Sequence, residues 1–281
     1  MEEIFAQILH LREHGEEAML VTVVEREGAV PAPPGTKMLV YPDGRTLGTV
    51  GGGALEKAAT AHALELLKQR RSELVRYALT PDERALDEEP TGMICGGRAA
   101  LFYDYLGYGH YLYLLGGGHV GRAVARHAKS LPFYITVIDH RADMGPVEGA
   151  HRLLIGDYEA LLADEAVPAG SYFLIATPSH AYDYVALRRI MSADWRPAYV
   201  GMIGSRQKAE TSIRQLAQEL GPEVNWEVLY CPVGLDIGGR SPDEIAISIL
   251  AEIQAVRHGK GGQRHMRLDA ALLAREVVGR G

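Results

Sequence analysis

One short loop constrains the fold of this chain more than any other feature: Gly116-Gly117-Gly118-His119-Val120-Gly121. A strand is predicted before it over 111–115, and a helix after it over 119–130. Glycines at the first, third and sixth positions of a strand–turn–helix are typical of a Rossmann unit that binds dinucleotides. There the first glycine makes a tight turn, the second lets the backbone approach a pyrophosphate, and the third lets helix and strand pack closely. The sequence therefore predicts a Rossmann domain in the second half of the chain.

An acidic residue follows the second strand of this unit. The strand is predicted over 134–138, and Asp139 comes next, 18 residues after the third glycine (121 to 139). A carboxylate there would accept hydrogen bonds from a ribose diol, while the helix N-terminus attracts phosphate. His140 and Arg141 follow directly, so a ligand with a 2′-phosphate stays open as an alternative. A glycine turn without a ligand is the competing interpretation, and the strand, helix and acid together favour a nucleotide.

Strands and helices alternate through the rest of the second half. Strands are predicted at 152–154, 172–176, 198–203 and 225–229, and helices at 158–163, 180–192, 205–219 and 241–258. Ser241, Pro242 and Glu244 have the spacing of a capping box at the start of the last helix. This alternation predicts a doubly wound parallel sheet.

The first half has no such alternation. Helices are predicted at 2–14 and 54–69, and strands at 19–24, 37–41, 74–79 and 99–106. The fold class is therefore α/β, with a smaller α+β domain before a C-terminal Rossmann-like doubly wound parallel sheet. We expect an α+β domain over 1–107 and a dinucleotide-binding domain over 110–258. A flexible tail with a short helix near 268–278 is expected over 259–281.

A second candidate site lies in the loop after the strand 172–176, where ligands bind in open α/β sheets. Thr177-Pro178-Ser179-His180 occupies this loop, and Asp183 comes three residues later. His180 and Asp183 would share a helix face and could orient or protonate a ligand. An ordinary helix N-cap with a surface histidine fits the same residues equally well, so both interpretations stay open.

A third candidate site follows the strand 198–203. Gly204-Ser205-Arg206 opens the next helix, and Lys208 lies in its first turn. Basic residues are unfavourable in that turn because the helix dipole is positive there. The pattern therefore favours a phosphate or other anion site over a simply capped helix.

The chain has two cysteines, Cys95 and Cys231. Two are too few for a disulfide framework or an all-cysteine zinc site. Cys95 stands before a glycine pair, where a thiolate could carry sulfur or bind a soft metal; a buried, inert cysteine is the alternative. The histidines are too scattered to predict a metal cluster.

Charge and hydropathy exclude several classes of function. The formal net charge of the 281 residues is −7, which argues against a nonspecific nucleic-acid binder. The sequence has neither an apolar stretch of about 18 residues nor a secretory signal pattern, so no membrane span is expected. The low cysteine content fits a reducing compartment, and we expect a cytoplasmic protein.

Six motifs occur in order over most of residues 15–256. They are Pro34-Gly35-Thr36-Lys37-Met38-Leu39-Val40, Gly48-Thr49-Val50-Gly51-Gly52-Gly53-Ala54-Leu55-Glu56, Met93-Ile94-Cys95-Gly96-Gly97, the loop 116–121 with Asp139, Gly204-Ser205-Arg206, and Gly234-Leu235-Asp236-Ile237-Gly238 leading to Ser241-Pro242-Asp243-Glu244-Ile245-Ala246. In this combination and order the chain resembles the XdhC/CoxI family of xanthine dehydrogenase accessory factors. It departs from the family pattern at Ala54, where many members carry a cysteine.

The resemblance implies a maturation chaperone rather than a turnover enzyme. Such a protein binds molybdenum cofactor, assists its sulfuration and passes it to an apo-molybdenum hydroxylase, with a cysteine desulfurase as a second implied partner. The pterin phosphate, or a dinucleotide form of the cofactor, would suit the glycine loop and Arg206. Cys95 would then lie near the molybdenum end. The family layout, an N-terminal domain before a Rossmann domain, fits a boundary near 107–110.

Two other functions compete with the chaperone. An NAD(P)-dependent oxidoreductase would use His180 as its acid or base, and a regulatory module would sense a nucleotide without chemistry. The dinucleotide fingerprint favours the oxidoreductase. The lack of a Tyr-Lys pair that can be placed near a nicotinamide speaks against it. A homodimer is expected because symmetric dimers are the commonest oligomers.

Overall fold

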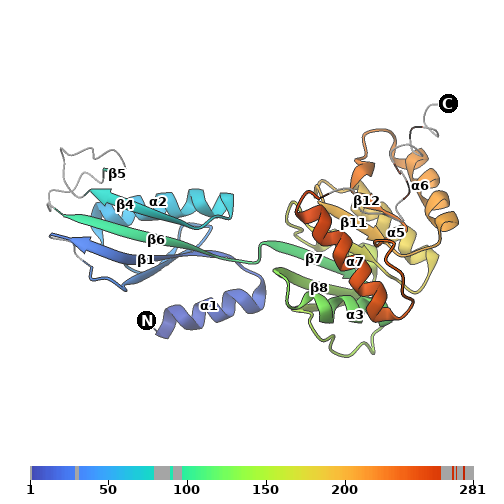
Figure 1. The fold of residues 1–281 in the computed structure, drawn as a ribbon, viewed down its shortest axis with the longest axis horizontal. Helices are drawn as coiled ribbons and strands as arrows, with labels where there is room; N and C mark the ends of the chain where they lie inside the picture. The colour runs from blue at the N-terminus through green and yellow to red at the C-terminus, as the bar shows by residue number, and fades with distance from the viewer. Residues whose placement is uncertain are drawn as a thin grey trace. The chain divides into compact units, whose positions relative to one another are not determined.

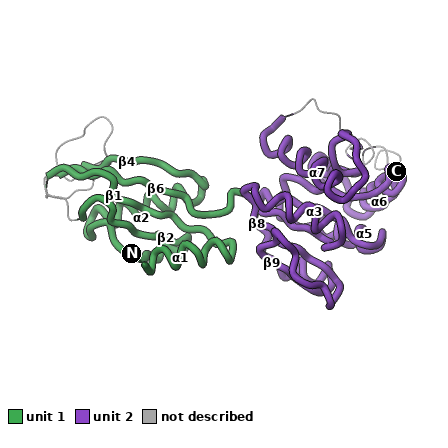
Figure 2. The backbone as a smooth tube through the Cα atoms, turned by 60° about the horizontal axis from the view of Figure 1, so that its bottom comes forward, with its two compact units in different colours: residues 1–109 green, residues 110–281 purple. Residues whose placement is uncertain are grey.

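The computed structural model describes residues 2–28, 32–78, 89–90 and 97–260, together with the single residues 268, 270 and 275. The chain divides into two compact units, residues 1–109 and 110–281, which Figure 2 colours green and purple. Among the helices of the described residues, none combines the length and apolar character that crossing a bilayer requires.

The first unit is built on a six-stranded sheet with the order β3-β2-β1-β6-β4-β5. Its strands are β1 (Ala18–Glu27), β2 (Lys37–Val40), β3 (Thr46–Gly48), β4 (Glu73–Ala78), β5 (Glu89–Pro90) and β6 (Arg98–Leu106), and its helices are α1 (Glu2–His14) and α2 (Gly53–Gln69). Neighbouring strands are antiparallel except for the short β4–β5 pair.

Alternating side chains on β1 explain how both helices pack on this sheet. Met19 and Val21 point to the face where α2 packs, whereas Leu20 contacts the cluster around α1 on the opposite face. Successive residues of a strand point to opposite faces, so one strand serves two clusters. Figure 1 shows both helices lying along the sheet.

The second unit is a six-stranded sheet with the order β12-β11-β10-β7-β8-β9, parallel throughout. Its strands are β7 (His110–Leu115), β8 (Phe133–Asp139), β9 (Arg152–Ile155), β10 (Tyr172–Ile175), β11 (Tyr199–Met202) and β12 (Leu229–Tyr230). Its helices are α3 (His119–Ala128), α4 (Tyr158–Asp164), α5 (His180–Ser192), α6 (Arg206–Leu220) and α7 (Pro242–Arg257), with a 3₁₀ turn at Trp226–Val228.

Helices cover both faces of this sheet. Helices α3 and α7 pack on one face, as Figure 1 shows, and α4, α5 and α6 pack on the other. Buried strands of this kind are apolar on both faces. In β7 one apolar core takes Leu112 and Leu114, and the other takes Tyr113 and Leu115.

The strand order reverses between β7 and β10. From β7 the chain adds β8 and β9 on one side, and then returns to place β10, β11 and β12 on the other. Loops that follow the strands on either side of such a switch point diverge and leave a crevice at the carboxyl edge of the sheet. The glycine loop follows β7, and the His180 loop follows β10.

The predicted fold class is confirmed: a doubly wound parallel sheet follows a smaller unit that mixes strands and helices. The strand predicted over 225–229 is wrong in its first part. The Asn225 side chain accepts the Glu227 N–H, which favours a 3₁₀ turn, and the strand is limited to Leu229–Tyr230. The helix expected near 268–278 lies outside the described residues apart from 268, 270 and 275.

Candidate functional site

The glycine loop turns the chain tightly from β7 into α3. Gly116 has a φ of +107°, and its N–H donates to the Ile138 carbonyl over 2.8 Å. A Cβ on Gly116 would lie 2.2 Å from the Ala176 carbonyl oxygen, and one on Gly121 would lie 1.9 Å from the Gly116 carbonyl oxygen. Both positions therefore need glycine because backbone atoms leave no room for a side chain. The tight turn and the close packing expected of the first and third glycines are confirmed.

The middle glycine is different. Gly118 is the N-cap of α3, with a φ of −72° that any residue adopts. A Cβ on Gly118 would meet no protein atom within 4 Å. The fold itself therefore gives no reason for a glycine there, whereas a ligand that must touch the backbone does.

The first turn of α3 also lacks the groups that normally occupy a helix N-terminus. No side chain caps it, and it holds no acidic residue. In the described part of the second unit, α4, α5, α6 and α7 each have a side-chain oxygen that accepts a backbone N–H. In the first unit, Glu56 of α2 accepts the N–H of Gly52. The α3 terminus thus keeps its N–H groups and its positive dipole end for an external anion.

The carboxylate of Asp139 lies beside this loop but is already in use. Its Oδ2 accepts the Gly117 N–H over 2.7 Å, and the Arg141 side chain binds both oxygens over 2.9 Å. Burial alone would raise the pKa of Asp139, but the bonds from Arg141 and the Gly117 N–H outweigh it and lower that pKa to about 2. The expected partner of Asp139 was a ribose diol; in this structure the carboxylate holds a protein guanidinium.

His140 lies at the end of β8, half-buried, among aromatic rings. Its ring centroid is 4.8 Å from that of Tyr182 and 5.9 Å from that of Tyr158. These rings come from α4 and α5, so the cluster joins the loops after β8 and β10 next to Asp139.

Asp183 caps its own loop instead of pairing with His180. It is buried and accepts the Thr177 N–H over 3.3 Å and the Thr177 hydroxyl over 2.5 Å. Burial raises the pKa of Asp183, although the Thr177 bonds act in the opposite direction. His180 is exposed, and among the described residues no hydrogen bond joins it to Asp183. The geometry therefore favours the N-cap interpretation of this loop over an acid–base pair.

The Gly204-Ser205-Arg206 segment forms an exposed, capped helix start. The Ser205 hydroxyl accepts the Lys208 N–H over 3.3 Å, which occupies one donor of α6. Arg206 and Lys208 are exposed at the same edge of the sheet as the glycine loop, because each segment follows the carboxyl end of a parallel strand. They can supply positive charge at that edge.

The two cysteines have different standings. Cys95 lies outside the described residues. Cys231 is 1% exposed in the core that α5 and α6 cover, and its burial, with the nearby charge of Asp183, raises its pKa to about 12. A thiol of that kind is inert because the thiolate is the reactive form.

We therefore expect Cys231 not to react in the native chain. In a Cys95→Ser variant, where Cys231 is the remaining thiol, Ellman's reagent should give no measurable colour until denaturant is added, and one equivalent afterwards. Rapid reaction of the native variant would contradict the burial described here.

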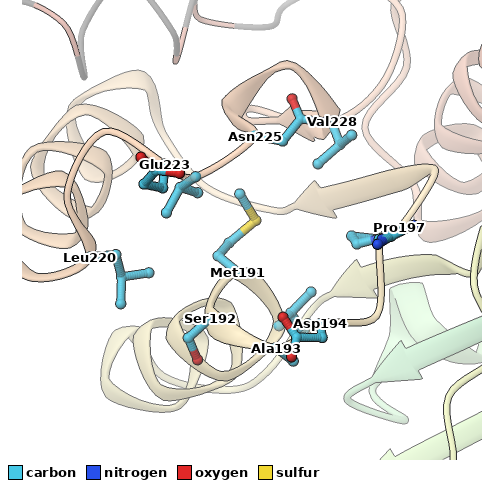
Figure 3. A pocket seen from close by; sticks show the side chains of 12 residues that line it. Met191, Ser192, Ala193, Asp194, Pro197, Leu220, Glu223, Asn225 and Val228 are labelled. Carbon is cyan, nitrogen blue, oxygen red and sulfur yellow. The ribbon is translucent and has the colours of Figure 1, made fainter.

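A hollow of about 470 Å³ opens at the opposite edge of the second sheet. It lies beside Pro197, which precedes β11, and beside the ends of α5 and α6. Figure 3 shows Met191 reaching toward its centre between Leu220 and Val228. Since ligands of open α/β sheets bind at the carboxyl edge, this hollow is not the nucleotide crevice.

Two residues at the glycine loop escaped the sequence analysis. Arg122 follows the third glycine directly, and its guanidinium lies 3.0 Å from the Met144 sulfur. Met144 in turn covers Gly117, because a Cβ there would lie 1.9 Å from its methyl carbon. The position of Arg122 next to the motif was a usable signal, whereas nothing in the sequence marked Met144.

Family models match both units. The model of the XdhC Rossmann domain matches residues 112–253, which are 142 residues (112 to 253 inclusive) or half of the 281-residue chain. The model described as the XdhC and CoxI family matches residues 11–78.

Three curated proteins are similar to the chain. Uncharacterized protein YqeB of Escherichia coli K12 is 31% identical over 94% of this chain, and the chain spans about half of that protein, 48%. A Bacillus subtilis 168 protein described as a probable xanthine dehydrogenase component is 23% identical over 88% of this chain and 95% of its own length. The molybdenum cofactor insertion chaperone PaoD of E. coli K12 is 44% identical over 63 residues, 22% of this chain and 20% of PaoD.

Proposed function

The chain belongs to the XdhC and CoxI family, and on this premise we propose that it is an accessory protein that binds molybdenum cofactor. In this proposal it assists sulfuration of the cofactor and its insertion into a molybdenum hydroxylase of the xanthine dehydrogenase type. The names of the B. subtilis and PaoD relatives support a role of this kind. An apo-hydroxylase and a cysteine desulfurase are the proposed partners, and a homodimer is the proposed assembly.

The observation that carries the proposal is the open N-terminus of α3. A phosphate of the cofactor would lie against the backbone N–H groups of Gly118, His119 and Val120, where a side chain at Gly118 would intrude. The cofactor phosphate is doubly charged, so the exposed Arg206 and Lys208 at the same edge would assist its approach. The residues present therefore suit the phosphate end of the cargo.

The sulfur end of the proposal rests on Cys95. Cys231 is unsuited to carry sulfur, because its thiol is buried and its pKa is raised to about 12. Cys95 is the other cysteine of the chain, and it stands in one of the motifs that define the family resemblance. We assign to it the transient sulfur, or a contact to the molybdenum end.

The geometry supports the chaperone better than an oxidoreductase. A histidine acting as acid or base needs a partner that orients its ring, and Asp183 is bound to Thr177 instead of His180. NAD(P) stays a proposed second ligand of the glycine loop, since the loop has the backbone of a dinucleotide site.

Reconstitution tests the function. Purified chain, molybdenum cofactor, a sulfur donor and an apo-hydroxylase are mixed, and the hydroxylase activity is measured. We expect Cys95→Ser to lower activation on the order of tenfold or more while the chain still binds the cofactor, because loss of the thiolate removes the sulfur carrier.

Cys231→Ala is the matched control. It removes the other thiol from a buried position, and we expect activation at the wild-type level once folding is verified. Full activation by Cys95→Ser would reject the sulfur role. Absence of any activation by the wild-type chain, with cofactor binding also absent, would reject the chaperone.

A further inference from the structure

The carboxylate of Asp139 has no capacity left for a ribose. Its Oδ1 accepts the backbone N–H of Arg141 over 3.0 Å and the Nε of the same residue over 2.9 Å. Its Oδ2 accepts the Gly117 N–H and the Nη2 of Arg141. A carboxylate has about four lone-pair positions, and four donors fill them here. A ribose diol would have to displace a bidentate guanidinium to reach it.

Arg141 is not the only cation at this corner of the loop. The Nη2 of Arg141 lies 3.7 Å from the Met144 sulfur, and the Nη2 of Arg122 lies 3.0 Å from the same sulfur on its own side. The two guanidinium groups therefore flank one side chain, directly over Gly117. Arg122 is also tied to the Pro146 carbonyl over 3.0 Å, which fixes its direction.

The charges that face this corner leave it positive. Asp139 is 1% exposed and lies behind the guanidinium of Arg141, whereas the Arg141 side chain is 44% exposed. Asp143 is exposed on the same segment and near enough to affect the pKa of Arg141, and the phenol of Tyr158 lies on the α4 side. His140 is next to Asp139, 3.7 Å from its Oδ1. Two arginines thus face solvent against one exposed acid.

We propose that Arg141, assisted by Arg122, determines which nucleotide the glycine loop accepts. The pair selects a ligand with a phosphate monoester on its ribose and disfavours one whose ribose diol is free. Guanidinium groups bind phosphate through paired, charge-assisted hydrogen bonds, while a neutral diol needs the acceptor that Arg141 occupies. In dinucleotide-binding folds an arginine at this place accommodates a 2′-phosphate. The inference rests on the glycine loop being the ligand site of the proposed function.

Two probes that differ in one group test the selectivity. Adenosine 2′,5′-bisphosphate and AMP share the base, the ribose and the 5′-phosphate, and differ in the 2′-phosphate. In calorimetric titrations of the full chain we expect the bisphosphate to bind at least about tenfold more tightly than AMP, as one well-placed charge-assisted contact allows. We expect Arg141→Met to remove that preference, because the substitution deletes the guanidinium and frees Asp139 for the diol.

Arg206→Met is the matched control, since it removes an exposed arginine from the same sheet edge without touching Asp139. It should weaken both probes alike and keep their ratio. Equal affinity of the wild-type chain for both probes, with both lost in Gly118→Val, would overturn the role of Arg141 and leave the loop as the site. No binding of either probe would overturn the inference, while the reconstitution assay still judges the chaperone separately.

Discussion

Gly118→Val is expected to fold like the wild-type chain and to lose its ligand. The valine side chain would project into the space at the start of α3 that no protein atom occupies, where the phosphate must contact backbone N–H groups. We expect affinity to fall on the order of 100-fold, about 3 kcal/mol, for adenosine 2′,5′-bisphosphate and for isolated molybdenum cofactor. Isothermal titration of the purified variant measures both losses.

Stability should change little in this variant. The φ of Gly118 suits valine, and a glycine-to-aliphatic change at an N-cap costs about 1 kcal/mol or less. Gly109→Val is the matched control, because a Cβ there also meets no atom within 4 Å and the residue lies outside the loop. Unchanged affinity of Gly118→Val would refute the loop as the binding site.

The third glycine of the same loop should behave in the opposite way. A Cβ on Gly121 would lie 1.9 Å from the Gly116 carbonyl, so Gly121→Val should unfold the second unit rather than block a ligand. Both tryptophans, Trp195 and Trp226, lie in that unit, and their fluorescence reports its unfolding. One motif therefore contains a residue held for binding and another held for packing.

The Rossmann unit was predictable because its sequence signals are local. Gly116 and Gly121 are required by carbonyls within the loop and at the end of an adjacent strand, and every fold of this class repeats those contacts. The capping box at Ser241 was predictable for the same reason, since Glu244 and Ser241 satisfy each other across one turn. The family resemblance stated from the motifs is confirmed by models that match both units.

The partner of Asp139 was not predictable in this way. A carboxylate after the second strand can bind a ribose or the arginine two residues later, and the sequence order is the same in both cases. The direction that Arg141 takes depends on the turn after β8 and on Met144 above Gly117. Asp183 gave the same kind of ambiguity, and its burial under Thr177 decided it.

Short strands were also missed because their stability comes from neighbours. β3 covers Thr46–Gly48, three residues without an alternating pattern, and it exists through its pairing with β2. The apolar character of Trp226–Val228 is typical of a strand, but the Asn225 side chain bonds locally and favours a turn. Tertiary pairing and local side-chain bonds outweigh propensity in such short segments.

Glu252→Ala should cause the largest loss of stability among single side-chain truncations at the second unit's carboxylates. Glu252 is fully buried in α7, where its Oε2 accepts the Tyr199 hydroxyl over 2.8 Å and the Gly234 N–H over 3.0 Å. Alanine would leave both donors buried without that acceptor and would open a cavity. Each unsatisfied donor costs about 1–3 kcal/mol, so we expect the free energy of unfolding to fall by about 4 kcal/mol.

Glu252→Gln separates the hydrogen bonds from the charge. Its amide oxygen can accept the same two donors in the same volume, so we expect a loss of about 1 kcal/mol in urea unfolding followed by tryptophan fluorescence. Gly234 opens the motif that runs to Gly238, and a Cβ on Gly234 would lie 2.5 Å from the Ser248 hydroxyl of α7. If Glu252→Ala were as stable as Glu252→Gln, α7 would not be what holds this motif in place. A large loss in alanine alone would show that the motif is fixed from behind by a buried carboxylate, at the same sheet edge as the glycine loop.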